Sequence, residues 1–347
     1  MISQEISGRR AGLKSVCIAG MFALPSAAAA GEPFDEHHDI EEIVVEASAL
    51  PRTVEQLAQP VTVVAGNDLA KKAAASIGQT LSAELGVSST YFGPVSSRPV
   101  IRGQFGERVR VLTNGLDSID ASALSEDHQA SVEGILADRI EIVRGPATLL
   151  YGSGAAGGLV NVVDNRIPEA PPGSPVSGKL ALNTNSAIGE ESAAGWIKFG
   201  GDDYALHVDY FRRDTDDVDI PGYAESAVLR RLEEEEGETA EEIRGTVENS
   251  ASSTDGGAVA ASWYGENGFI GIAVSSFDSD YDVPAEHAHE EELPAPAGEE
   301  EEEEVSIKLD QTRVDLKGEY GFSGPIERLS FRIADNDYEH TEFEGAE

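Results

Sequence analysis

The C-terminal half of the chain alternates apolar and polar side chains one by one. Around residue 207, the apolar positions are Tyr204, Leu206, Val208 and Tyr210, and the positions between them are Ala205, His207 and Asp209. Successive side chains of a β-strand point to opposite faces, so this pattern predicts strands with one apolar and one polar face. Such strands suit a membrane β-barrel with a wet interior, although a soluble β-sandwich gives the same alternation. Seven strands are predicted, at residues 176–187, 191–200, 203–213, 257–265, 268–279, 305–320 and 327–340.

The links between these strands alternate in length, and this favours the barrel. Short, turn-like links follow the second, fourth and sixth strands, whereas long links follow the third and the fifth. Membrane barrels keep short turns on the periplasmic side and long loops outside. The long links also carry much of the charge: residues 214–256 hold 14 acids and 3 bases, and residues 278–304 hold 13 acids and no base. We expect both links to be solvated, mobile loops on the outer side.

Residues 51–170 follow a different pattern, which predicts a compact α+β domain. Short β-branched runs are separated by turns, and two helical stretches lie among them. The segment is nearly neutral, with 10 bases and 13 acids, and the pattern breaks at a cluster of prolines near residues 168–172. The predicted strands lie at residues 61–64, 100–102, 108–112, 139–144 and 159–163, and the helices lie at 69–76 and 81–85.

The first thirty residues have the pattern of a cleaved secretory signal peptide. Three basic residues precede an apolar stretch at residues 15–24, and a run of alanines at 27–30 offers a cleavage site. An N-terminal membrane anchor is the alternative, but the apolar stretch is short for a spanning helix. Cys17 is the only cysteine and lies in this segment, so the mature chain is expected to have neither disulfide nor thiol chemistry.

Composition and motifs exclude several classes of function. The chain has 347 residues, with 25 Lys and Arg against 64 Asp and Glu, and its formal net charge is −39. Nucleic acid is therefore not expected as a partner. No hydrolase or zinc-protease motif is present, so we do not expect an enzyme. Gly152, Gly154 and Gly157 have the spacing of a dinucleotide site, but a strand-like run follows where that site needs a helix.

Four segments, at residues 39–47, 98–103, 109–115 and 140–152, together resemble a known family. Their order and spacing resemble the energy-coupling box and the plug of TonB-dependent outer-membrane receptors, over about residues 40–165. The plug positions that carry the resemblance are Arg98, Arg102, Gly103, Asn114, Gly115, Glu141, Arg144, Gly145, Tyr151 and Gly152.

The resemblance implies an active importer in the outer membrane of a Gram-negative bacterium, surrounded by outer-membrane lipids and without a tightly bound cofactor. It divides the chain into a signal peptide (1–30), a coupling-box segment (31–50), an α+β plug domain (51–170) and part of a transmembrane antiparallel β-barrel (171–347). Receptors of this kind have about 22 strands, and seven are predicted in this sequence. We therefore expect the chain to be an N-terminal portion of a longer receptor.

The coupling box corresponds to Glu42, Ile43, Val44, Val45 and Glu46. This β-prone run lies in an acidic segment, so it could add as a strand to the sheet edge of a partner. From the residues alone, an ordinary first strand of the domain explains the run equally well. The resemblance implies that the partner is a TonB-type energy-coupling protein in the periplasm.

The second long link holds the strongest candidate metal ligands, Glu286, His287, His289 and Glu290. Alternate histidines of an extended segment can point the same way, and imidazole with carboxylate suits zinc and its divalent neighbours. A polar loop that binds nothing specific is the alternative. The acidic link and the strand after it resemble the zinc-uptake branch of the family, which implies extracellular zinc as cargo. The branch carries a denser histidine loop, where this chain has glutamates at residues 299–304.

Other interpretations stay open. The cargo could instead be an iron-siderophore, haem or another organometallic chelate, and an exported acidic metal-binding or adhesive protein is an alternative of another class. His37 and His38 could touch a metal, although a flexible tail also explains them. His207 shares a predicted face with Asp209 and is a candidate for a relay site, whereas no motif surrounds His128 or His340.

Overall fold

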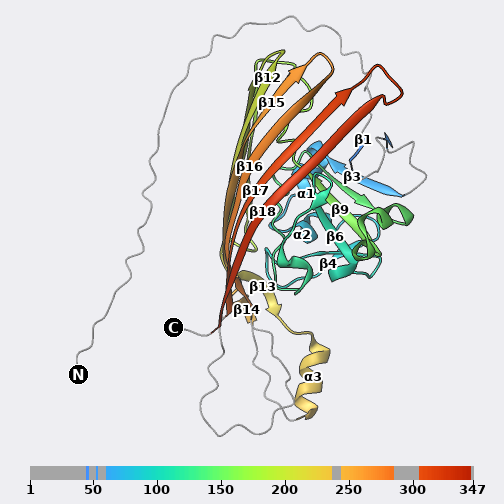
Figure 1. Cartoon of the computed structure of the whole chain (residues 1–347). Coiled ribbons are helices and arrows are strands. Elements are labelled where there is room, and N and C mark those ends of the chain that lie inside the picture. Colours follow the sequence, from blue (N-terminus) through green and yellow to red (C-terminus); the bar gives the residue numbers. More distant parts are fainter. Residues whose placement is uncertain (1–43, 47–51, 54–59, 237–243, 285–304, 345–347) are drawn as a thin grey trace, which may run out of the picture. The chain divides into compact units, whose positions relative to one another are not determined.

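The computed structural model describes residues 44–46, 52–53, 60–236, 244–284 and 305–344 (Figure 1). They form a small α+β domain and, after it in the chain, a large antiparallel sheet (Figure 1). This is the fold predicted from the sequence. No helix in these described ranges is long and apolar enough to cross a membrane.

The α+β domain is built on a five-stranded sheet with the order β3-β8-β9-β6-β7. Its strands are β3 (Val61–Ala65), β8 (Arg139–Val143), β9 (Gly158–Val163), β6 (Val109–Thr113) and β7 (Leu116–Asp117). Within this described sheet, β6 and β9 pair in parallel and the other neighbours are antiparallel. The helices α1 (Gly66–Lys72) and α2 (Ile77–Leu81) follow β3, and β4 (Val87–Ser89) pairs with β5 (Pro99–Ile101). Short 3₁₀ segments lie at Gly106–Arg108, Ala121–Ala123, Pro146–Tyr151 and Ser153–Ala155.

Apolar residues from the strands and helices form the core of this domain. Leu81, Ile101, Ile140, Ile142 and Val160 are fully buried in one cluster. The glycine-rich run after residue 151 forms a 3₁₀ turn that leads into strand β9 rather than into a helix. The fold therefore agrees with the prediction, made from the sequence, that these glycines do not form a dinucleotide site.

The large sheet has seven strands in chain order, each antiparallel to its neighbours. They are β10 (Val176–Asn185), β11 (Glu190–Gly200), β12 (Tyr204–Thr215), β15 (Ser252–Gly265), β16 (Gly268–Val283), β17 (Val305–Gly321) and β18 (Arg328–Glu344). All seven predicted strands are confirmed, and most extend a few residues beyond the predicted ends.

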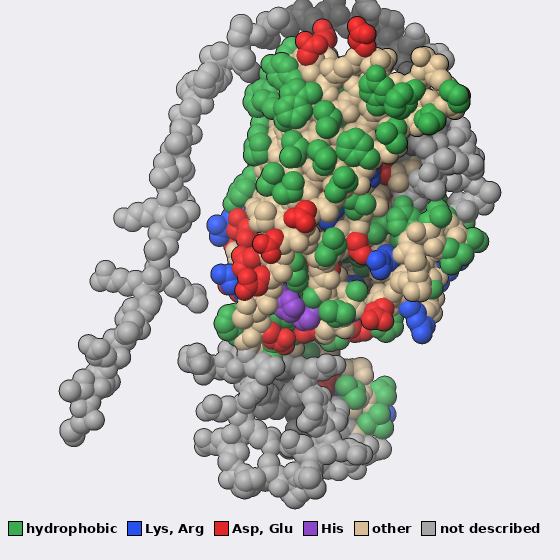
Figure 2. Space-filling model, viewed as in Figure 1, with side chains coloured by type: hydrophobic (Ala, Val, Ile, Leu, Met, Phe, Trp, Pro, Cys, Tyr) green, Lys and Arg blue, Asp and Glu red, His purple; other side chains and the backbone are tan. Residues whose placement is uncertain are grey.

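The apolar face of this sheet is exposed and its polar face is buried, which is the reverse of a sheet in a soluble protein. On β12, Leu206 and Val208 are 43% and 41% exposed, whereas His207 and Asp209 are 3% and 5% exposed. The polar face packs against the α+β domain, and the apolar face looks outward (Figure 2). A soluble sandwich would bury the apolar face instead, so the observed arrangement is that of a lipid-facing wall.

Carboxylates form a row on the outer face, beyond the apolar band. Asp255 pairs with Asp278, Asp278 with Asp310, and Asp310 with Glu339, across four adjacent strands. Directly paired residues share a face, so these four side chains lie side by side. Figure 2 shows acidic side chains gathered below the apolar band in this view.

The first long link is not the structureless loop that its charge predicts. Within residues 214–256, β13 (Val218–Tyr223) pairs with β14 (Arg244–Val247), and α3 spans Ala227–Glu236 (Figure 1). Val218 is buried in an apolar cluster with Tyr281 of β16, and the Tyr223 ring lies 3.8 Å from the Arg230 guanidinium. Apolar and cation–π contacts therefore give this part of the link a defined structure, in spite of its negative charge.

Candidate functional site

A loop of the α+β domain brings a histidine to the polar face of the sheet. The Asp120 carboxylate closes this loop, because it accepts hydrogen bonds from the backbone N–H groups of Ser122 (3.1 Å) and Ser131 (3.0 Å). An aspartate side chain commonly closes a turn in this way. His128 lies between these two ends, in a stretch that is neither helix nor strand.

The histidine faces a second histidine on the last strand of the sheet. The ring centroids of His128 and His340 are 4.8 Å apart, and the planes are inclined by 57°. Tyr338, also on β18, lies 5.7 Å from the His340 ring. The two histidines are far apart in the sequence and meet only because the loop packs against β18.

The geometry of the pair suits a shared metal ion. Two nitrogens bound to one tetrahedral metal at about 2 Å leave their ring centroids roughly 5 Å apart, which is close to the observed 4.8 Å. The Nδ1 atom of His128 lies 3.3 Å from the carbonyl oxygen of Ala121. If Nδ1 donates to this carbonyl, Nε2 keeps its lone pair for a metal. Among the described residues, no group of three or more metal-ligating side chains is present, so this part of the chain offers two imidazoles and no complete ligand set.

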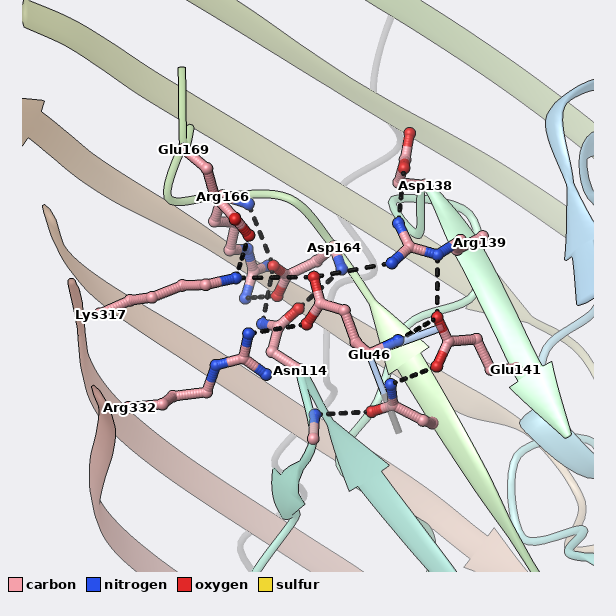
Figure 3. A network of polar contacts seen from close by, with 12 residues as sticks. Glu46, Asn114, Asp138, Arg139, Glu141, Asp164, Arg166, Glu169, Lys317 and Arg332 are labelled. Carbon is pink, nitrogen blue, oxygen red and sulfur yellow. Dashed lines mark hydrogen bonds and ion pairs between the residues drawn. The ribbon is translucent and has the colours of Figure 1, made fainter. Parts of the chain in front are cut away.

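A second site joins residues 44–46, called the coupling segment below, to both the domain and the sheet (Figure 3). An ion pair of 2.8 Å links the Glu46 carboxylate to Arg332 of β18. Lys317 of β17 and Arg139 of β8 lie 3.5 and 3.6 Å from the same carboxylate. Glu46 therefore lies among three cations that come from three different strands.

These cations set the protonation of Glu46. Burial alone would raise the pKa of this carboxyl, but Arg332, Lys317 and Arg139 together hold it below its ordinary value. The group is therefore ionised at neutral pH. Its charge links this segment to Lys317 and Arg332 of the sheet.

A chain of hydrogen bonds extends the coupling site into the domain. The backbone N–H of Glu46 donates to the buried Glu141 carboxylate (3.0 Å), which also accepts from the Asn161 amide (3.0 Å). Asn161 in turn accepts from the backbone N–H of Gly115 (2.7 Å). The chain thus connects the coupling segment to the turn between β6 and β7.

The predicted coupling strand pairs within its own chain. Val44 and Val45 form β1, which is antiparallel to β2 (Arg52–Thr53). Val45 is 1% exposed and packs with Leu112 and Leu159 of the domain. In this state the strand is occupied, so pairing with a partner requires its release.

The other plug positions singled out from the sequence have structural roles. Asn114 (φ 51°) and Gly115 (φ 78°) form the tight turn between β6 and β7, as Arg102 and Gly103 do after β5. Such turns need positive φ at both central positions. Arg98 and Arg144 are buried and donate to backbone carbonyls of Ser122 and Leu85. Gly145 and Gly152 flank the 3₁₀ segment that ends at Tyr151.

His207 forms a buried anchor with its neighbour instead of an open relay. Its Nε2 lies 2.8 Å from Asp209, and Arg166 holds that carboxylate with two bonds of 2.9 and 3.0 Å. Arg213 on the same strand pairs in a similar way with Glu133 of the domain, at 2.6 and 3.2 Å. Both guanidiniums fix the domain against β12.

Several predicted site residues lie outside the described residues. They are the coupling-box residues Glu42 and Ile43, and the candidate metal ligands His37, His38, Glu286, His287, His289 and Glu290. The sequence reasoning missed the pair of His128 and His340. One signal was available, because His340 has the same strand parity as Arg332 and Asn336, which the alternation places on the polar face.

Known proteins resemble this chain in two ways. Residues 53–159 match the family model TonB-dependent Receptor Plug Domain. Among curated proteins, the Rhizobactin receptor of Rhizobium meliloti (strain 1021) is 28% identical over 188 residues, which are 51% of this chain and 24% of that protein. The Hemin receptor of Yersinia pestis is 34% identical over 125 residues, which are 35% of this chain and 18% of that protein. The matched part of the chain thus covers a quarter or less of these relatives.

Solved structures share the fold. The Copper transporter OprC superposes with a TM-score of 0.59 at 19% identity, over 81% of this chain and 37% of that one. The FrpB iron transporter from Neisseria meningitidis has a TM-score of 0.57 at 13% identity, over 81% and 41%. The relatives are receptors and transporters, which agrees with the prediction that the chain is not an enzyme.

Proposed function

We propose that this chain, whose residues 53–159 match the plug domain of TonB-dependent receptors, supplies the plug and the first strands of an outer-membrane importer. The carrying observation is the sheet that turns its apolar face outward and its polar face toward the plug. A lipid-facing wall around a plug is the arrangement that a gated importer needs. The outer-membrane location predicted from the sequence agrees with a relative from Vibrio cholerae, an Iron-regulated outer membrane virulence protein.

The coupling step acts on residues 42–46. In the docked state Val45 is buried and Glu46 is held by three cations. A TonB-type partner that pairs with this strand in the periplasm would pull the segment from its place and, through Glu141, strain the plug. The energy would come from the partner.

The cargo is a divalent metal ion, and we assign zinc. The supporting observation is the spacing of His128 and His340, which suits one tetrahedral ion. The second long link, with His287 and His289, joins β16 to β17. Its two flanking residues, Val283 and Val305, pair with each other, and Val305 pairs with Glu344, four residues from His340 on β18. A metal ion captured by the link would therefore arrive at the end of the sheet that holds the pair.

Haem or an iron chelate is the second candidate, because two of the curated relatives are named for rhizobactin and hemin. A porphyrin between two axial imidazoles would hold the ring centroids about 6 Å apart, since each metal–nitrogen bond is about 2 Å. The observed 4.8 Å is too short for that arrangement. Haem held by one histidine, or a chelate held by other groups, would still fit.

The test is energised uptake by the full-length receptor in whole cells, with zinc, haem and an iron-siderophore offered separately. We expect zinc uptake that falls strongly in His128→Asn and His340→Asn. His207→Asn is the matched control, because this buried histidine faces Asp209 instead. Uptake of haem or siderophore but not of zinc would assign the second candidate.

A further inference from the structure

The loop that carries His128 is closed by Asp120 and also contacts a tyrosine of the sheet. Residues 125–132 have no helix or strand to fix their backbone. Tyr281 of β16 reaches this stretch with its hydroxyl group, and only 1% of the residue is exposed. Its ring lies in the apolar cluster that includes Ala75, Val95 and Val283.

The hydroxyl group of Tyr281 holds the backbone on both sides of His128. It donates to the carbonyl oxygen of Asp127 at 3.2 Å and accepts from the N–H of Gln129 at 3.0 Å. Neither bond involves the side chain of His128. The two bonds therefore hold the backbone next to His128, whichever side chain stands at position 128.

We propose that Tyr281 is a positioning residue of the metal site, an inference that rests on the proposed function. It orients the imidazole of His128 toward His340, and it ties the plug to the strand that leads into the acidic, histidine-bearing link after Val283. Groups that orient metal-ligating histidines commonly change metal affinity by about 10–100-fold. Tyr281 acts one step further back, because it fixes the backbone that carries the ligand.

The experiment measures metal binding to the purified full-length receptor in detergent. Tyr281→Phe keeps the ring in its cluster and removes both hydrogen bonds. We expect Zn²⁺ affinity to fall roughly tenfold, with an unchanged number of sites. With saturating Co²⁺ as the probe, the visible band of tetrahedral cobalt should change its shape, because the ligand geometry changes, whereas partial unfolding would only lower its intensity.

The matched control is Tyr264→Phe. Tyr264 lies on β15 of the same sheet, at the other end of the strands. Its hydroxyl group donates to the carbonyl oxygen of Pro168 at 3.2 Å. This variant should bind Zn²⁺ and Co²⁺ as the unmodified receptor does.

A double-variant comparison separates this inference from the proposed function. In a His128→Ala background, Tyr281→Phe should cause no further loss of zinc affinity, because the ligand that it positions is gone. An additive loss, or a Tyr281→Phe variant with unchanged affinity and cobalt spectrum, would overturn the positioning role. If His128→Ala alone leaves zinc binding intact, the zinc site itself is wrong, and the inference fails with it.

Discussion

The Glu46 carboxylate of the coupling segment forms an ion pair of 2.8 Å with Arg332 on the last strand of the sheet. Glu46→Gln keeps the shape of the side chain and removes its charge. Breaking a fully buried ion pair by removing one partner costs about 3–5 kcal/mol, and the cost here is smaller because the Glu46 side chain is 17% exposed. We expect the segment to detach, with a spin label or thiol reagent at Val44→Cys reporting the release.

The matched control for this release is Glu169→Gln. Glu169 also pairs with Lys317 but is 47% exposed and does not belong to the coupling segment. A label at residue 44 should stay docked in this variant. Equal release in both variants would show that the charge of Glu46 does not hold the segment.

Docking of the segment should be insensitive to pH over the physiological range. The pKa of Glu46 lies below its ordinary value of 4.5, so the stability contributed by its ionised form is fully present above that value. It is lost only as the pH falls through the lowered pKa. We expect the label at residue 44 to stay docked from about pH 8 to pH 5, and release with a midpoint near neutrality would contradict this assignment.

Uptake should require the backbone N–H of residue 44. Proline at this position removes a hydrogen-bond donor from the strand that the partner would use. Val44→Pro should therefore abolish energised zinc uptake, while zinc binding to the purified receptor stays intact. Val44→Thr, which keeps both the N–H and the β-branch, should transport normally. Transport by the proline variant would count against strand addition.

The plug should be sensitive to added volume at Gly78. A methyl group at this position would lie 2.6 Å from the carbonyl oxygen of Ser97, which is backbone and cannot move aside easily. Overpacking of this kind costs about 1–3 kcal/mol. Gly78→Ala should lower the midpoint of plug unfolding in urea, whereas Gly173→Ala meets nothing within 4 Å and should not. Equal midpoints would show that the plug relaxes around the added methyl.

The second long link should act as a capture loop for metal. Changing His287 and His289 to alanine should reduce zinc uptake at low external zinc and spare uptake at high zinc, because His128 and His340 remain. His37→Ala with His38→Ala is the control, since these residues precede the coupling segment. Uptake that is unchanged at every zinc concentration would reduce the link to an acidic surface.

Much of the fold could be predicted because it depends on local periodicity. The alternation around Leu206 and His207 fixes both the strand and the face that each side chain occupies, and the structure has the same two faces. The turn at Asn114 and Gly115 is also local, since positive φ at two successive residues restricts which residues fit.

The sites were harder to predict because they depend on contacts between distant segments. No local pattern links Glu46 with Arg332, or His128 with His340. His128 lies in an irregular loop, where neither a helical nor a strand period gives its direction. The link after β12 was predicted from its charge alone, and the apolar contacts of Val218 overrode that signal.

The row of carboxylates on the outer face also fixes a depth. Charged side chains are costly in the hydrocarbon layer. In the proposed barrel, Asp278 and Asp310 therefore lie at the boundary between the hydrocarbon layer and water. His340 pairs with Leu309, one residue along from the pair of Asp310 and Glu339, and thus stands level with that boundary on the inside. If the proposed importer is correct, the two histidines lie at the outer rim of the bilayer, and an ion bound there would still have the whole thickness of the membrane to cross.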